Sequence, residues 1–121
     1  MRLREQDNDV MECDGVSSVK LCEKAEKILH EALDLHPDKL QEEVEEVENI
    51  FSKLRDCLIA LLREDARVMP LQQSRWRKPL DHVNVAISLV TGIVYPSAGI
   101  HRVRMEEARD MIEKAKEMLG G

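Results

Sequence analysis

Aromatic residues are scarce in this sequence. Phe51, Trp76 and Tyr95 are the only three in 121 residues, whereas Leu, Val, Ile, Met and Ala are plentiful and charged residues make up 35% of the chain. Strands are enriched in aromatic and β-branched residues, so the composition argues against a sandwich or barrel and favours helices that pack through aliphatic side chains. A chain of this length is expected to form one domain around one hydrophobic core.

Positive charge is also in deficit. The net charge of −6 argues against general nucleic-acid binding, because that activity needs an excess of Lys and Arg to neutralise phosphates. The charge is uneven, with 8 basic and 16 acidic side chains in residues 1–62 and 10 and 8 in residues 63–121. Such charges usually keep helix faces solvated. The alternative is that the acidic face from Glu42 to Glu48 steers or occupies a basic partner.

Cysteines are few, odd in number and without a C-x-x-C pair. With no signal-like apolar run near the N-terminus, Cys13, Cys22 and Cys57 predict a reducing compartment, the cytoplasm or nucleus. Cys22 and Cys57 lie among apolar helical positions and are expected to be buried thiols. The histidines do not combine with the cysteines at metal-ligand spacings, so we expect no metal and no cofactor.

No apolar run is long enough to suggest a transmembrane segment. The most apolar stretch, residues 83–94, is far shorter than the roughly 20 residues that a helix needs to cross a bilayer. Residues 1–16 mix charged and polar residues without a period and predict a flexible tail. The remaining chain, residues 17–121, is expected to be the folded domain.

The strongest signal that is present is one long amphipathic helix over residues 38–67. Its apolar residues alternate at spacings of four and three, which places them on one face: Leu40, Val44, Val47, Phe51, Leu54, Leu58 and Leu61. Its first half is acidic outside this stripe, but residues 57–62 are apolar all round. That end is expected to be covered on several sides, by further helices or by a partner.

Two shorter amphipathic helices flank the long one in the sequence. Residues 17–36 are expected to start at an N-cap on Ser17 or Ser18 and to stop before Pro37. Residues 98–119 are expected to follow an N-cap on Ser97 and to end at the two C-terminal glycines. The apolar stripe of this last helix is Met105, Ala108, Ile112, Ala115 and Leu119.

Residues 80–95 have two interpretations. Apolar and small residues alternate over residues 83–89, which is typical of a strand. Four polar residues have helical spacing instead: Asn84, Ser88, Thr91 and Tyr95. A lone strand would leave its backbone groups without partners, so we predict a helix with Asp81 as N-cap and Pro96 after its end. It is either a core helix whose polar edge reaches water or a helix docked on another protein.

These patterns predict an all-α, antiparallel, up-and-down four-helix bundle with a disordered N-terminal tail. Nine residues are expected at the centre of the core: Leu54, Leu58, Leu61, Ile87, Val90, Val94, Val103, Met111 and Ile112. The linker between the second and third helices holds Trp76 among Arg75, Arg77 and Lys78. This segment either binds an anionic group, or Trp76 folds back as a lid on the bundle.

Our leading hypothesis is a non-catalytic protein–protein interaction module, a helical adaptor or subunit of a larger assembly. It would dock a partner through apolar surface on the third helix and the late part of the second, as a helix-in-groove contact or a homo-oligomer. Ten residues are predicted to contact the partner: Trp76, Arg75, Arg77, Lys78, Asn84, Ser88, Leu89, Thr91, Ile93 and Tyr95. The alternative is a ligand-binding bundle that takes an anionic lipid or phosphate at Arg75–Lys78. We expect no enzyme, because no nucleophile and base pair is suggested by the sequence.

Overall fold

The computed structural model describes residues 13–32, 37–91 and 100–120, and this part of the chain holds four α-helices and no strand. They are α2 (Gly15–Ala32), α3 (Pro37–Asp65), α4 (Arg77–Thr91) and α5 (Ile100–Met118), with a short 3₁₀ helix, η1 (Leu71–Gln73), between α3 and α4. The prediction of a helix rather than a strand at residues 80–95 is confirmed. Of the tail predicted over residues 1–16, residues 1–12 lie outside the described residues, whereas Cys13 is held by a disulfide and Gly15 and Val16 already belong to α2. The predicted N-cap at Ser97 and the predicted helix end at Pro96 also lie outside the described residues.

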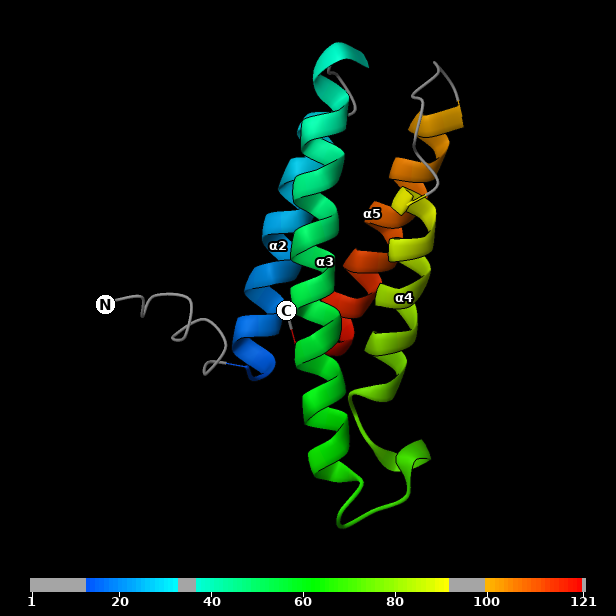
Figure 1. Ribbon diagram of the computed structural model, residues 1–121. Coiled ribbons are helices and arrows are strands. Elements are labelled where there is room, and N and C mark those ends of the chain that lie inside the picture. The colour runs from blue at the N-terminus through cyan, green and yellow to red at the C-terminus, as the bar shows by residue number, and fades with distance from the viewer. Residues whose placement is uncertain (1–12, 33–36, 92–99, 121) are drawn as a thin grey trace, which may run out of the picture.

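The four helices run alternately up and down (Figure 1). α2 packs against α3 and α5, and α4 packs against the same two helices from the other side, so that the four enclose one core. The predicted all-α antiparallel bundle is therefore confirmed. α3 is the longest helix, and its C-terminal end extends past the ends of α2 and α5 (Figure 1).

The core lies around the middle of α3. Phe51 is its largest fully buried side chain, and Leu54, Leu58, Val90 and Ile112 are buried as predicted. Leu61, Ile87 and Met111 are only half-buried at the edge of the core. Val94 lies outside the described residues.

The core prediction is wrong for Val103, which is 55% exposed. The predicted α5 stripe, in contrast, is buried along its whole length: Met105, Ala108, Ile112, Ala115 and Leu119. Val103 precedes Met105 by two residues, which places it about 200° around the helix axis and on the solvent side. Gly120 follows the helix with a φ of +102°, a conformation that favours glycine.

The start of α2 differs from the prediction. Asp14, not Ser17 or Ser18, is the N-cap, because the Ser17 backbone N–H donates a hydrogen bond to Asp14 Oδ1 at 2.7 Å. This hydrogen bond lowers the pKa of Asp14, since it favours the charged carboxylate. Ser18 is buried instead, and its hydroxyl lies 3.4 Å from Cys57 Sγ.

The start of α4 also differs. The helix begins at Arg77, and Asp81, the predicted N-cap, is an exposed residue inside it. Buried Ser74 caps this end, since its hydroxyl accepts a hydrogen bond from the Trp76 N–H at 3.2 Å and donates one to Asp65 at 2.7 Å. Ser74 thereby joins the end of α3 to the start of α4.

The prediction that Cys57 is a free thiol is wrong. Cys13 and Cys57 form a disulfide with a Cα–Cα distance of 5.4 Å, which ties the residues before α2 to α3. Only Cys22 is free and buried among the described residues, as predicted. Sequence spacing missed the bridge because residues 44 apart can meet only once α2 lies along α3. An odd count of cysteines therefore does not support a reducing compartment here, because disulfides persist mainly under oxidising conditions.

Candidate functional site

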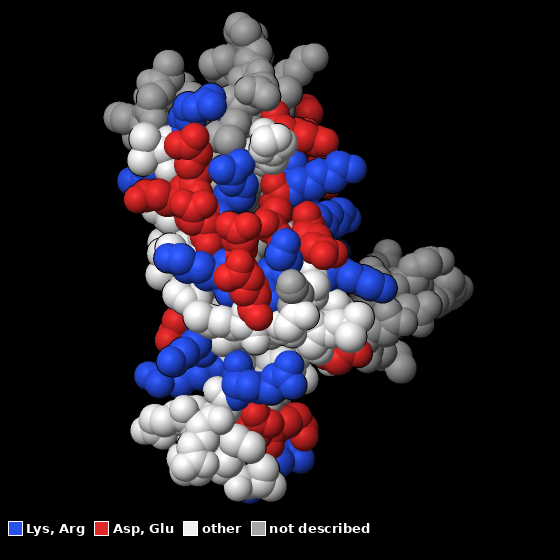
Figure 2. All heavy atoms as spheres, turned by 180° about the vertical axis from the view of Figure 1, so that it is seen from behind, with Lys and Arg blue, Asp and Glu red and all other residues white. Residues whose placement is uncertain are grey.

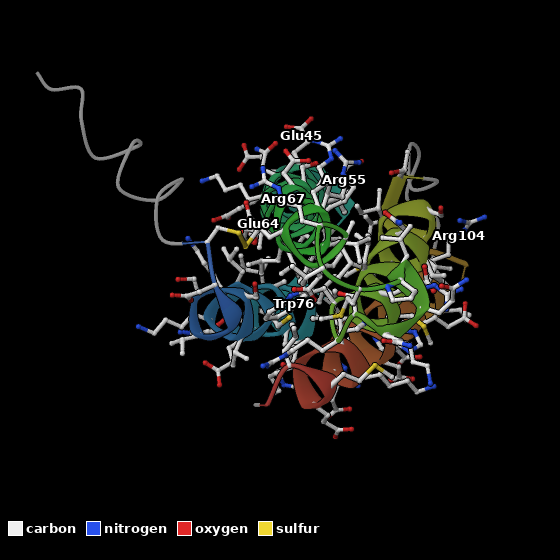
Figure 3. The ribbon with its side chains drawn as sticks, turned by 90° about the horizontal axis from the view of Figure 1, so that it is seen from below. Glu45, Arg55, Glu64, Arg67, Trp76 and Arg104 are labelled. Carbon is white, nitrogen blue, oxygen red and sulfur yellow. A yellow bond between two sulfur atoms is a disulfide. The ribbon has the colours of Figure 1, made fainter. Side chains whose placement is uncertain are left out.

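Trp76 closes the lower end of the bundle. Its side chain is 9% exposed and belongs to the core, and seen from below it lies between the helices (Figure 3). The Arg75 guanidinium stacks over the Trp76 ring at 4.4 Å from the ring centroid. Trp76 therefore closes the bundle as the lid interpretation predicted, and its role as a partner contact stays a prediction.

The basic residues around Trp76 point away from the core. Arg75, Arg77 and Lys78 are all exposed, and the last two occupy the first turn of α4. The bundle mouth is filled by Trp76, so what remains there is an open hollow of about 590 Å³ between the start of α2 and the end of α5. Its charged lining is mixed in sign: Asp14, Lys20, Glu23 and Arg75.

The predicted contact residues of α4 fall on two different sides of the helix. Asn84, Ser88 and Thr91 are exposed along one line, which is the polar edge that the spacing predicted. Leu89 is half-buried and faces α5, where Arg104 Nη1 donates a hydrogen bond to the Leu89 carbonyl at 3.3 Å. Ile93 and Tyr95 lie outside the described residues.

Leu89 belongs to a groove between α4 and α5, with a volume of about 470 Å³. We call this surface the α4–α5 groove. Its apolar lining is Val85, Leu89 and Met111, and its charged lining is Glu107, Asp110, Glu113, Lys114 and Glu117. Val85 is 46% exposed although the opposite side of α4 is fully packed in the core. The groove therefore combines one exposed and two half-buried apolar side chains with four carboxylates and one amine.

Sequence reasoning missed most of this groove. It placed Met111 in the core and gave Val85 no role. A signal was present, because Glu107, Met111 and Lys114 follow the spacing of four and three that defines one helix face. Met118, seven residues after Met111, continues this face and is 44% exposed. The stripe was hidden because its members alternate between charged and apolar residues.

The described residues offer little reactive chemistry. Cys22 is fully buried, and that burial raises the pKa of its thiol to about 12, so the reactive thiolate does not form near neutral pH. No group of three or more His, Cys, Asp or Glu side chains that could hold a metal ion occurs in this part of the chain. The two features that stand out among these residues are the hollow beside Trp76 and the α4–α5 groove.

The chain matches no protein-family model, no curated protein and no solved structure. Among residues 13–32, 37–91 and 100–120, no helix combines the length and the apolar character needed to cross a membrane.

Proposed function

We propose that this protein is a non-catalytic interaction module whose α4–α5 groove binds an amphipathic helix of another protein. The observation that carries the proposal is an apolar floor of exposed Val85 and half-buried Leu89 and Met111 within an acidic rim. The core faces of α4 and α5 are already filled by Val83, Val90, Ala108 and Ile112 and their neighbours. Val85 is therefore surplus to the packing of the bundle, whereas Leu89 and Met111 pack against the core and also line the groove.

The shape of the groove favours a helix as the occupant. Two antiparallel helices leave a long furrow between them, and an amphipathic helix can lay its apolar face into such a furrow. Exposed Met118 extends the apolar lining toward the C-terminal end of α5. Methionine suits this role because its flexible, polarisable side chain adapts to a partner.

The charge of the groove defines the chemistry of the partner. Glu107, Asp110, Glu113 and Glu117 outnumber Lys114 on the rim, so Lys and Arg beside the apolar stripe of the partner helix would be favoured. Charge complementarity of this kind mainly raises the association rate and the specificity, and it weakens as salt is added. A helical adaptor or assembly subunit that holds a basic partner helix fits these properties.

Capture from an extract with paired variants tests this proposal. We expect Val85→Glu to weaken binding of the captured partner by about tenfold or more, since a carboxylate would enter the apolar floor. Asn84→Glu is the matched control, because it adds the same charge at an exposed position next to Val85 and outside the groove. Each captured protein is then titrated in purified form against both variants.

A second pair tests the acidic rim. The double variant Glu107→Lys with Glu113→Lys should bind the same partner more weakly, and its affinity should depend less on salt. The double variant Glu42→Lys with Glu46→Lys makes an equal charge change on exposed residues of α3 and should leave the affinity unchanged. Equal binding by Val85→Glu and Asn84→Glu would overturn the proposal. If light scattering shows a dimer that only Val85→Glu dissociates, the partner helix is a second copy of this chain.

A further inference from the structure

The most exposed large apolar side chain among the described residues lies not in the groove but on the loop between α3 and α4. Val68 is 80% exposed and Leu71 is 50% exposed, with Pro70 exposed between them. We call residues 68–71 the loop tip. The loop forms the lower end of the molecule, beyond the ends of α2 and α5 (Figure 1). The tip therefore lies beyond α2 and α5, and η1, which holds Leu71, contacts α4 alone among the four helices with more than a weak contact.

The loop holds its tip outward through internal hydrogen bonds. The Met69 N–H donates to the Asp65 carbonyl at 3.0 Å, and the Gln73 and Ser74 N–H groups donate to the Pro70 and Leu71 carbonyls at 2.9 and 3.1 Å. Ser74 and Trp76 then anchor the loop to the bundle. The loop therefore keeps Val68 and Leu71 in water, close together in the sequence, where they add an apolar surface that the core does not use.

Basic side chains flank the loop tip on both sides in the sequence. Five exposed ones flank it in sequence, and we call them the basic collar: Arg63, Arg67, Arg75, Arg77 and Lys78. The acidic residues of this segment are engaged, since Glu64 pairs with Arg67 at 3.8 Å and Asp65 accepts the Ser74 hydroxyl. Residues 63–78 thus carry five basic and two acidic side chains, net +3, within a chain of net charge −6.

The surface view agrees with this arrangement. Figure 2 shows acidic and basic residues mixed over the upper part of one face, then a band of Lys and Arg, and below it a lower end that is uncharged on one side and carries acidic and basic residues at its other edge. An apolar tip flanked by a basic collar matches the boundary of an anionic bilayer, where apolar side chains enter the acyl region and Lys and Arg meet lipid phosphates. It does not match the α4–α5 groove, which is concave and acidic.

We propose that the loop tip and basic collar dock this protein onto an anionic lipid membrane. Val68 and Leu71 insert at the interface, and Arg75, Arg77 and Lys78 bind the phosphates of neighbouring lipids. Trp76 stays in the core and fixes the height of the loop. This inference does not rest on the proposed partner helix, because the groove lies farther along α4 and uses none of these residues.

Vesicle sedimentation with the full chain tests the inference. The wild-type protein should bind phosphatidylcholine vesicles containing phosphatidylserine and should bind pure phosphatidylcholine vesicles far more weakly. Arg75→Glu, Arg77→Glu and Lys78→Glu together should weaken binding about a hundredfold or more, because each basic residue near an anionic surface contributes on the order of 1 kcal/mol. Val68→Ser with Leu71→Ser should weaken it about tenfold.

The controls separate the local site from general charge and from loss of fold. Lys24→Glu, Lys27→Glu and Lys53→Glu together change the net charge equally at exposed positions elsewhere and should bind like the wild type. Val85→Ser removes a comparable exposed apolar group from the groove and should also be silent. Circular dichroism should be the same for all variants, since every changed residue is exposed. Absence of wild-type binding to the anionic vesicles, or equal losses in the two charge-reversed variants, would overturn the inference.

Discussion

Around its middle, α3 buries Val47, Phe51 and Leu54 completely. At its C-terminal end every residue from Cys57 to Leu62 is apolar, yet Ala60 is exposed, and Leu61 and Leu62 are only half-buried. The difference lies in the neighbours, because α2 and α5 end before α3 does (Figure 1). The apolar composition of a segment determines how much of its surface could be buried with a gain in stability. The lengths of the neighbouring helices determine how much of that surface is in fact buried.

The largest expected effect tests this comparison directly. Phe51→Ala should lower the free energy of unfolding by about 3–5 kcal/mol, since it leaves a cavity in the densest part of the core. Leu62→Ala at the far end should cost only about 1–2 kcal/mol, because its side chain is already partly in water. Urea melts of the two variants measure both values. Equal losses would mean that the end of α3 is as well covered as its middle.

Loss of the disulfide should give the next largest effect. The bridge joins the residues before α2 to Cys57 of α3, where the less buried apolar segment of that helix begins. Replacing Cys13 and Cys57 together by serine should lower stability by about 2–4 kcal/mol, as expected for a cross-link that closes a long loop. Urea melts with and without a reducing agent measure this. The reducing agent should destabilise the wild type and leave the double variant unchanged. Two reactive thiols in the native protein would contradict the bridge.

The smallest expected effect comes from removing the ion pair between Glu26 of α2 and Lys116 of α5. Lys116 Nζ lies 2.8 Å from Glu26 Oε1, an oxygen that is shielded from water. The Glu26 carboxylate beside it raises the pKa of Lys116 above its ordinary value, so the stabilisation is complete below that ordinary value and is lost as the pH rises through the raised one. Lys116→Met should cost about 0.5–1 kcal/mol at pH 7.

Melts across a range of pH check this assignment. The stability difference between the wild type and Lys116→Met should shrink only above pH 10.5. Lys114→Met, an exposed neighbour on the same helix, should show little loss at any pH. A difference that disappears already near neutral pH would argue against the pair.

Local patterns predicted the helices well. The α5 stripe from Met105 to Leu119 is buried as its spacing required, since a regular helix turns a repeat of three and four residues into one face. The polar edge at Asn84, Ser88 and Thr91 was found for the same reason. The predicted helix starts were less accurate, because a cap depends on which side-chain oxygen reaches the first free N–H groups. Asp14 and Ser74 are of the same residue types as the predicted caps, so residue type alone could not distinguish them.

The candidate sites were harder to predict than the helices. Leu89 was identified as a contact residue, but its companions in the groove, Val85 and Met111, come from two helices whose rotation about their axes is set by the packed core. The basic residues were identified at Arg75–Lys78, whereas Val68 was not, because an apolar residue in a linker gives no sign of whether it will fold inward.

The sequence by itself determined the helical content, the helix faces and the acidic and basic segments, since these depend on residues a few positions apart. Only the tertiary structure decided that Cys13 forms a disulfide with Cys57, that Trp76 closes the end of the bundle and that α3 extends beyond α2 and α5. Those outcomes depend on how four helices of unequal length align around one core. The same alignment leaves an acidic groove on the side of the bundle and a basic, apolar loop at its end.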